Sequence, residues 1–521
     1  MAPDGATGER RRGRYALAGA VAAAVALGAT ELVAGALPGT PSLVESVASL
    51  VIDLAPTGLV RAAIAALGTR DKPALVTGVV VLALVFGAGL ALAARRRRWV
   101  AAAGLAAFGA LGAWAGARPP DTVLWRPALT AAAGVLAGVA TLAALVWRHR
   151  RPALAAAPAP PSPAPVAALA SRRSFLAGAG SLLAVGVAAA AGGRLLQSQA
   201  RAAARAGVVL PRLAQRAPRP GPAFEVPGLS PFITPTAAFY RVDTATFPPL
   251  VDVKRWRLKV DGLVDRPFEL TYDELLAMPM EEHDVTLVCV SNEVGDRLTG
   301  NARWRGVRLD ELLRRAGPRP EAAQLVGRSV DGFSTGFPTA LALDGRNALV
   351  AVGMNGSPLP DAHGFPARLV VPGLYGYTSA CKWLQEIRLT RLQDFDPYWV
   401  QRGWAREGQM KTMARIDTPP PGRRLRPGRV PVAGVAWTHH VAVSKVEIQV
   451  DDGPWARARL GPGDQDTWRQ WRTEWDASPG EHTLRARATD GQGQLQTATA
   501  SQSFPSGATG WHTVRVTVAP A

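Results

Sequence analysis

The sequence predicts three regions of different fold class: an N-terminal α-helical transmembrane bundle, a central α+β domain, and a C-terminal all-β sandwich of the immunoglobulin-like (Ig-like) kind. Three observations support this prediction. Apolar stretches of membrane-spanning length are confined to the first 200 residues, strands and short helices alternate from about residue 237, and only strand patterns follow residue 415. A chain of 521 residues is also too long for one compact domain.

The first region, residues 1–151, contains four stretches that reach the ~20 apolar residues needed to span a bilayer. They cover residues 15–36, 74–94, 99–117 and 122–147. Residues 41–68 are amphipathic and interrupted by charged residues, so we expect an interfacial segment there rather than a span.

The second region, residues 152–205, begins with a Pro/Ala linker at 152–170, which we expect to be extended, and continues into a fifth apolar stretch at 175–193. Between them, the sequence SRRSFL at 171–176 has the pattern of a twin-arginine export signal. A basic flank on an ordinary helix is the alternative interpretation. No convincing cleavage site follows, so we expect this stretch to remain as an anchor.

Arginine clusters such as Arg95–Arg98 and Arg172-Arg173 flank the apolar stretches. The positive-inside rule keeps them in the cytoplasm and puts everything after residue ~195 outside. The expected location is therefore the cytoplasmic (cell) membrane, multi-pass, with the lipid bilayer as a partner and the later domains on the extracytoplasmic side. The net charge of +19 comes without a reader motif, so no nucleic-acid partner is expected. Met1 apart, no His, Met or Cys precedes His149, which excludes haem held between these helices.

The central domain, residues 206–414, is predicted from alternating strand and helix patterns. Strands are expected at 256–262, 285–290 and 367–373, and helices at 270–278, with Thr271 as N-cap, and at 307–317, with a glycine stop. The last region, residues 415–521, shows short alternating strands at 443–455, 481–491 and 511–518, which is typical of an Ig-like sandwich.

The chain has two cysteines, which could form one disulfide. We expect Cys381 to be a small buried side chain. Cys289 stands at the end of an apolar strand, where the chain turns polar at Ser291 and Asn292. Such a position holds a sulfur rigidly at the mouth of a pocket, and a thiolate is a soft ligand for a metal.

Several stretches resemble the sulfite oxidase family of molybdopterin enzymes. They are TLVCVSNEVG, GNARWRGVRLDELL, MNGSPLPDAHGFPARLVVPGLYGYTSACKW and the terminal WHTVRV, and the resemblance covers about residues 230–521. It implies a two-electron oxidoreductase with a molybdenum–molybdopterin cofactor (Moco), Cys289 as metal ligand, and a central domain of the sulfite oxidase type. It further implies that the cofactor is bound by Tyr240, Arg241, Asn292, Asp331, His363, Arg368 and Lys382, and that Arg241 and Trp404 act beside the metal. Without the resemblance, Asp331 would be a turn residue and His363 a loop histidine.

Departures from the family pattern bear on the substrate. An arginine expected after Cys289 is replaced by Glu293-Val294, an arginine expected before WHTVRV is missing, Trp404 stands at the position of a tyrosine, and Val242-Asp243 replaces an Asn-His pair. Loss of cations disfavours an anion, so we expect a neutral small-molecule substrate rather than sulfite.

The expected electron carrier is external, either a cytochrome or a quinone. A homodimer through the Ig-like region is left open, because that region mediates dimerisation in relatives. The alternative function is a catalytically inactive relative that serves as a membrane-tethered binding module.

Overall fold

The computed structural model of the protein describes residues 4–37, 39–67, 70–97, 99–118, 122–147, 164–218 and 221–520. The chain divides into two compact units. The first, which we call the helical unit, comprises Met1–Ala206 and Thr244–Leu250. The second, the β-rich unit, comprises Gly207–Asp243 and Val251–Ala521.

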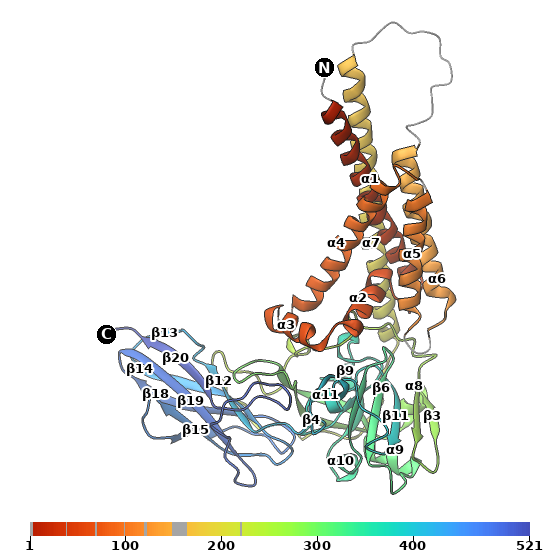
Figure 1. Cartoon of the computed structure of the whole chain (residues 1–521). Helices are drawn as coiled ribbons and strands as arrows, with labels where there is room; N and C mark the ends of the chain where they lie inside the picture. Colours follow the sequence, from red (N-terminus) through yellow and green to blue (C-terminus); the bar gives the residue numbers. More distant parts are fainter. Residues whose placement is uncertain are drawn as a thin grey trace. The chain divides into compact units, whose positions relative to one another are not determined.

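The helical unit is built from long helices and two short ones (Figure 1). They are α1 (Asp4–Ala36), α2 (Leu43–Leu54), α3 (Thr57–Leu67), α4 (Asp71–Ala93), α5 (Trp99–Gly116), α6 (Trp125–Leu142), which ends in a π-helical turn (Ala143–Trp147), and α7 (Ala164–Ala206). Within the described residues of this unit, five helical segments are long and apolar enough to cross a membrane: Arg12–Ala36, Asp71–Ala93, Trp99–Gly116, Trp125–Val146 and Arg173–Ala206. They coincide with the five stretches predicted from the sequence.

Two parts of this unit differ from simple spans. The described part of the stretch at 41–68 contains α2 and α3, which are each too short to cross a bilayer. The prediction of an extended linker at 152–170 was wrong for residues 164–170, which are the first turns of α7. These residues are alanine-rich, and Pro165 lies in the first turn, where a missing N–H costs little. The remainder of the linker, residues 152–163, lies outside the residues that the structure describes.

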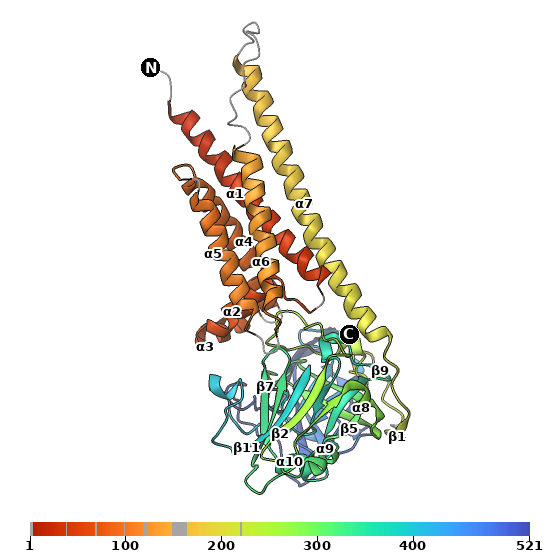
Figure 2. The same ribbon diagram turned by 90° about the vertical axis from the view of Figure 1, so that its right-hand side faces the viewer.

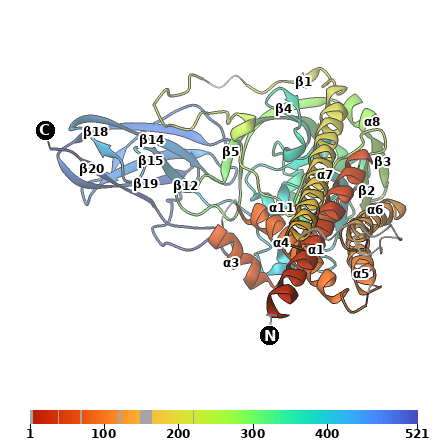
Figure 3. The ribbon, with the colours of Figure 1, turned by 90° about the horizontal axis from the view of Figure 1, so that it is seen from above.

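Helices α1 and α7 approach each other closely through glycines. A Cβ added at Gly28 would lie 2.1 Å from the carbonyl oxygen of Gly186, and one at Gly35 would lie 2.3 Å from that of Gly193. Small residues at such crossings let helix backbones touch, as in membrane helix pairs. Figures 2 and 3 show the two helices side by side, with α5 and α6 to one side of the pair in the view from above.

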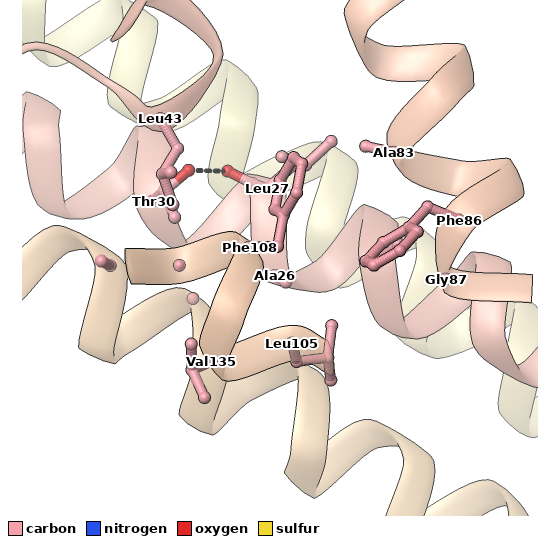
Figure 4. A pocket seen from close by; sticks show the side chains of 14 residues that line it. Ala26, Leu27, Thr30, Leu43, Ala83, Phe86, Gly87, Leu105, Phe108 and Val135 are labelled. Atoms are coloured by element: carbon pink, nitrogen blue, oxygen red, sulfur yellow. Dashed lines mark hydrogen bonds between the residues drawn. The ribbon is translucent and has the colours of Figure 1, made fainter. Parts of the chain in front are cut away.

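A small apolar pocket lies between α1, α4, α5 and α6 (Figure 4). The rings of Phe86 and Phe108 stand against it with their centroids 5.9 Å apart. Thr30, a polar residue that lines the pocket, donates its hydroxyl hydrogen to the Leu27 carbonyl at 2.7 Å, so this group is already satisfied within α1.

The β-rich unit contains two sheets in its first part. One has the order β1 (Leu213–Gln215), β4 (Met280–Val288), β5 (Thr299–Arg308), β8 (Leu349–Met354), β10 (Arg368–Val370), and β9 (Ser357–Pro358) pairs with β8. The other has the order β3 (Phe268–Thr271), β2 (Arg257–Gly262), β11 (Leu384–Thr390), β6 (Gln324–Ser329), β7 (Ser334–Pro338). Four short helices connect the strands: α8 (Tyr272–Ala277), α9 (Leu309–Ala316), α10 (Ala340–Leu343) and α11 (Gly376–Ser379).

The local signals that predicted two of these helices are present in the structure. Thr271 caps α8 in a capping box, because its hydroxyl accepts from the Glu274 amide while the Glu274 carboxylate accepts from the Thr271 amide. Helix α9 ends at Gly317, whose φ of 70° is the left-handed conformation that glycine adopts without a Cβ penalty. Both helix predictions are confirmed.

The C-terminal part is made of strands that form two further sheets (Figure 1). One has the order β12 (Met413–Thr418), β14 (Gly428–Trp437), β18 (Arg469–Ala477), β17 (Arg459–Leu460). The other has the order β13 (Arg424–Leu425), β20 (His512–Val518), β19 (Gly480–Asp490), β15 (Val443–Val450), β16 (Ala456–Arg457). Residues of both sheets, among them Val446, Trp471 and Val514, share one buried apolar cluster, so the sheets pack face to face.

Candidate functional site

Cys289 directly follows the last residue of β4 and begins a tight turn that runs to Leu298, here called the cysteine loop (residues 289–298). Its amide donates to the Leu298 carbonyl at 2.9 Å, and the Asn292 amide donates to the Cys289 carbonyl at 3.0 Å. The buried Asn292 side chain accepts from the Leu298 amide at 2.7 Å. Asn292 therefore holds the turn closed, and its role in binding the cofactor stays a prediction.

The C-terminal sheets hold the same loop from outside. The Arg415 guanidinium on β12 donates to the Asp296 carbonyl at 3.0 Å, and it is paired with Asp417 at 2.7 Å. His512 on β20 packs against Gly295, where an added Cβ would lie 2.4 Å from its Nε2. The terminal motif WHTVRV thus supports the loop that carries the cysteine.

Both cysteines are free and buried, so the disulfide is excluded. Cys381 is fully buried, which confirms its prediction as a small buried side chain. Burial raises the pKa of the Cys289 thiol, whereas hydrogen bonds from Ser291 and the charge of Lys382 act in the opposite direction. A cation close enough to act on the thiol is what a thiolate ligand needs.

The side chains expected to bind the cofactor gather near this thiol. Burial raises the pKa of Tyr240, and the next largest influences on it come from Cys289 and Arg368. The Tyr240 hydroxyl also lies 3.7 Å from a Cβ position built at Gly376. Tyr240 is therefore close enough to Cys289 and Arg368 for their charges to act on it.

His363 is buried and neutral. Burial, with help from the charges of Arg368 and Lys382, lowers the pKa of His363 to about 4. Its Nε2 lies 3.2 Å from the Thr236 carbonyl oxygen and must carry the proton in that contact. Its Nδ1 is then an acceptor, and this buried atom has no hydrogen-bond partner among the described residues. A buried atom left in that state indicates a missing donor.

Arg368 and Lys382 are the buried cations of the site. The Arg368 guanidinium donates to the His363 carbonyl at 3.1 Å and lies 4.9 Å from the Trp304 ring centre, and burial lowers the pKa of Arg368 to about 10. The Lys382 ammonium donates to the Ala362 carbonyl at 3.1 Å, and burial lowers its pKa to about 8. Neutral carbonyls satisfy only part of the Arg368 charge, so this guanidinium is suited to bind an anion, whereas Lys382 also contacts the carboxylate of Asp243.

Lys382 and Arg241 share one partner that sequence reasoning did not assign to the site. Both donate to the carboxylate of Asp243, whose side chain is 1% exposed. The sequence showed only that Asp243 replaces an expected histidine. The pairing could not be predicted, because Lys382 lies more than a hundred residues away in the chain.

Asp331 and Trp404 lie at the edges of this group. The Asp331 carboxylate accepts from the Phe333 amide at 3.1 Å, which is the turn role, and burial raises the pKa of Asp331. Trp404 packs on Phe504 at 5.3 Å and on Tyr377 at 5.9 Å between ring centres. Its apolar cluster includes Val288 and Val290, which flank Cys289. Roles for both residues at the cofactor or metal stay predictions.

Tyr375 is a further site residue that the sequence analysis passed over, although it lies within the motif GLYGYTSACKW. Burial raises the pKa of Tyr375 to about 12, and Cys289 is one of the groups that act on it. Its hydroxyl accepts from the Lys411 amide at 3.2 Å. No spacing rule separates this tyrosine from Tyr377, so only the fold identifies it.

Comparisons with known proteins agree with this geometry. Residues 245–399 match the family described as "Oxidoreductase molybdopterin binding domain". An uncharacterized oxidoreductase, YuiH of Bacillus subtilis, is 33% identical over 177 residues, which are 33% of this chain and 84% of the relative. The chain belongs to the sulfite oxidase family of molybdopterin-dependent oxidoreductases.

Other known proteins are similar to different lengths of the chain. Mitochondrial sulfite oxidase of Mus musculus is 28% identical over 342 residues, which are 56% of this chain and 62% of that enzyme. Nitrate reductase [NADH] 1 of Oryza sativa is 34% identical over 194 residues, 32% of this chain and 21% of that enzyme. Among solved structures, the sulfane dehydrogenase SoxCD from Paracoccus pantotrophus has a TM-score of 0.47 and 24% identity, covering 53% of this chain and 79% of that one.

The cofactor of the family is molybdenum–molybdopterin, and the residues of this chain fit it. A free thiol, two buried cations and a buried histidine acceptor lie close together. Cys289 would hold the metal, Arg368 and Lys382 would hold the phosphate, and His363 Nδ1 would accept from the pterin. The expectation of a sulfite-oxidase-type oxidoreductase is confirmed.

Proposed function

We propose that the chain is a membrane-anchored molybdopterin oxidoreductase that carries out two-electron redox chemistry on a neutral small molecule other than sulfite. The observation that carries this proposal is the grouping of the Cys289 thiol with Tyr240, His363, Arg368 and Lys382 in one buried cluster. These side chains come from separated segments of the chain, and a cofactor with a metal, a pterin and a phosphate would use each of them.

The side chains divide the work of binding. Cys289 presents its sulfur from a loop closed by Asn292, so the sulfur does not need to be reoriented on binding. Arg368 and Lys382 would compensate negative charge at positions largely shielded from water, where charges interact more strongly. The bound cofactor supplies the two-electron chemistry, which for this class we propose to be oxygen-atom transfer.

The proposed preference for a neutral substrate rests on the surroundings of Trp404. Its ring stands in an aromatic group with Tyr377, Trp399 and Phe504. Glu293 of the cysteine loop carries a negative charge where an arginine would attract an oxyanion, and its carboxylate accepts from the Ser503 amide at 2.9 Å. Aromatic faces and a carboxylate favour a neutral or weakly polar molecule over a dianion.

The setting of the enzyme is part of the proposal. The five helical segments of membrane-spanning length among the described residues support anchoring in the cytoplasmic membrane, and the arginine clusters support placement of the β-rich unit on the outer face. We further propose that the protein is exported by the twin-arginine route and that an external cytochrome or quinone is its electron carrier. The C-terminal part is proposed to be an Ig-like sandwich through which a homodimer forms. The four-domain division at 151, 205 and 414 stays a prediction.

The test uses the full chain purified in detergent from cells that make the cofactor. Molybdenum measured by mass spectrometry should approach one atom per chain, and reduction of a sulfoxide with a viologen dye, or oxidation of a neutral sulfide with a dye acceptor, should exceed sulfite oxidation. Cys289→Ala should abolish turnover, whereas Cys381→Ala should retain it. Protein without molybdenum would favour the inactive binding module, and dominant sulfite oxidation would refute the substrate class.

A further inference from the structure

The carboxylate of Asp243 stands among the cations of the cofactor site. Its side chain is 1% exposed, and it accepts from Arg241 Nε at 2.7 Å and from Lys382 Nζ. Buried carboxylates are costly unless they are paired, so this contact with two cations is a built feature. The single negative charge of this carboxylate offsets one of the three positive charges that Arg241, Arg368 and Lys382 carry together.

The two cations paired with Asp243 face different surroundings. Lys382 is 11% exposed and also donates to the Ala362 carbonyl beside His363, deep in the site. Arg241 is 40% exposed, so its guanidinium lies where a small molecule in solvent can reach it. The resemblance to the sulfite oxidase family also implies that Arg241 acts beside the metal.

We infer that Asp243 is a specificity-determining residue that pairs with Arg241 and thereby excludes anionic substrates from this site. This inference rests on the proposed function, because it assumes that Arg241 borders the substrate. An anion that approached Arg241 would meet a carboxylate bonded to the same guanidinium. Coulomb attraction to the cation would then be offset by repulsion at nearly the same distance. A neutral molecule meets no such opposition.

The same carboxylate positions Lys382. With Asp243 on one side and the Ala362 carbonyl on the other, two of the three ammonium N–H groups are occupied. Asparagine at position 243 keeps an acceptor oxygen for one cation but removes the charge. The substitution Asp243→Asn therefore separates the charge effect from most of the geometry.

The experiment measures binding of sulfate to the full-length holoenzyme in detergent by isothermal titration calorimetry. The Kd of the wild-type protein for sulfate should be above about 10 mM, and the Kd of Asp243→Asn should be lower by a factor of at least about ten. The double variant Arg241→Gln/Asp243→Asn should lose that gain, because the freed guanidinium is removed. Asp452→Asn, which removes an equal charge at a side chain that is 97% exposed in the C-terminal part, should leave sulfate binding at the wild-type value.

The outcomes separate the inference from the proposed function. Unchanged sulfate affinity in Asp243→Asn, or a gain that survives in the double variant, would overturn the inference even if the wild-type protein holds molybdenum. Absence of molybdenum from the wild-type protein counts against the proposed function, yet the sulfate comparison still reports on the Asp243–Arg241 pair. If Asp243→Asn fails to fold, the wild-type measurement decides: a Kd for sulfate below about 10 mM would overturn the inference, and a higher Kd supports it.

Discussion

Protonation of His512 should weaken the support of the cysteine loop at mildly acid pH. Its Nδ1 accepts from the Ile416 amide at 3.0 Å, and its ring packs on Gly295 of the loop. Burial, followed by the charge of Arg415, lowers the pKa of His512 from 6.5 to about 4. The folded protein therefore keeps this ring neutral at a pH where the unfolded chain protonates it.

The magnitude follows from linkage between protonation and folding. A base whose folded pKa is depressed loses stability as pH falls below its unfolded pKa, and the loss continues until the folded pKa is reached. With values of 6.5 and about 4, the loss from His512 between pH 7 and pH 5 is about 2 kcal/mol. The ring is only 8% exposed, so little solvent screening reduces this figure.

Hydrogen exchange measured by mass spectrometry on peptides covering β12 and β20 gives the opening free energy at each pH, after correction for the chemical exchange rate. His512→Asn keeps an acceptor for the Ile416 amide but does not titrate. The stability difference between wild type and this variant should therefore shrink by about 2 kcal/mol from pH 7 to pH 5.

His482 on β19 provides a control with the opposite sign. Its hydrogen bond with Asp451 raises the pKa of His482, so this pair is strongest below pH 6.5 and weakens as pH rises. His482→Asn should therefore make the protein more sensitive to acid, not less. A His512→Asn protein with the same loss between pH 7 and pH 5 as the wild type would refute the reasoning.

Three further predictions concern other parts of the chain. Burial lowers the pKa of Lys382 to about 8, so its positive charge is lost as pH rises from 7 to 9. The amount of molybdenum that stays with the protein through gel filtration should therefore fall over that range. Lys382→Met should retain less molybdenum than the wild type at pH 7 and show no such dependence on pH. Asn292→Ala leaves the Leu298 amide without its acceptor and should lower the opening free energy of the cysteine loop by about 1–3 kcal/mol. Asn292→Asp keeps an acceptor oxygen and should lower this free energy by less. Equal losses in the two variants would contradict the role of the acceptor. Gly28→Ala places a Cβ 2.1 Å from the Gly186 carbonyl oxygen and should destabilise the helical unit of the detergent-solubilised protein by about 1–3 kcal/mol. Gly78→Ala should not destabilise it, because no atom lies within 4 Å of a Cβ built at Gly78. Indistinguishable melting curves of the two variants would contradict this packing.

Much of the fold could be predicted because its signals are local. The capping residue Thr271 and the terminal Gly317 define helices through contacts within a few residues, and the apolar stretches define the long helices through composition alone. The apolar run before Cys289 likewise predicts β4, and the polar residues after it predict a turn. The one extended segment predicted wrongly, at 164–170, is an alanine-rich continuation of a long helix.

Site residues could be predicted from the sequence where a single residue in a motif indicates the chemistry. They could not be predicted where the role depends on a contact between two residues that are distant in the chain. Cys289, His363 and Arg368 stand out by type and motif. Asp243 acquires its role only through Lys382, and His512 only through Gly295, and each pair is distant in sequence. Such contacts depend on how the sheets of the β-rich unit pack, which no local pattern records.

X-ray absorption at the molybdenum edge tests the central claim, that Cys289 is the protein ligand of the metal, most directly. Spectra of the full-length wild type and of Cys289→Ser, each with its molybdenum content measured, should differ by one sulfur neighbour of the metal, which an oxygen neighbour replaces in the variant. Cys381→Ser should give the wild-type spectrum. An unchanged number of sulfur neighbours in molybdenum-loaded Cys289→Ser would contradict the account.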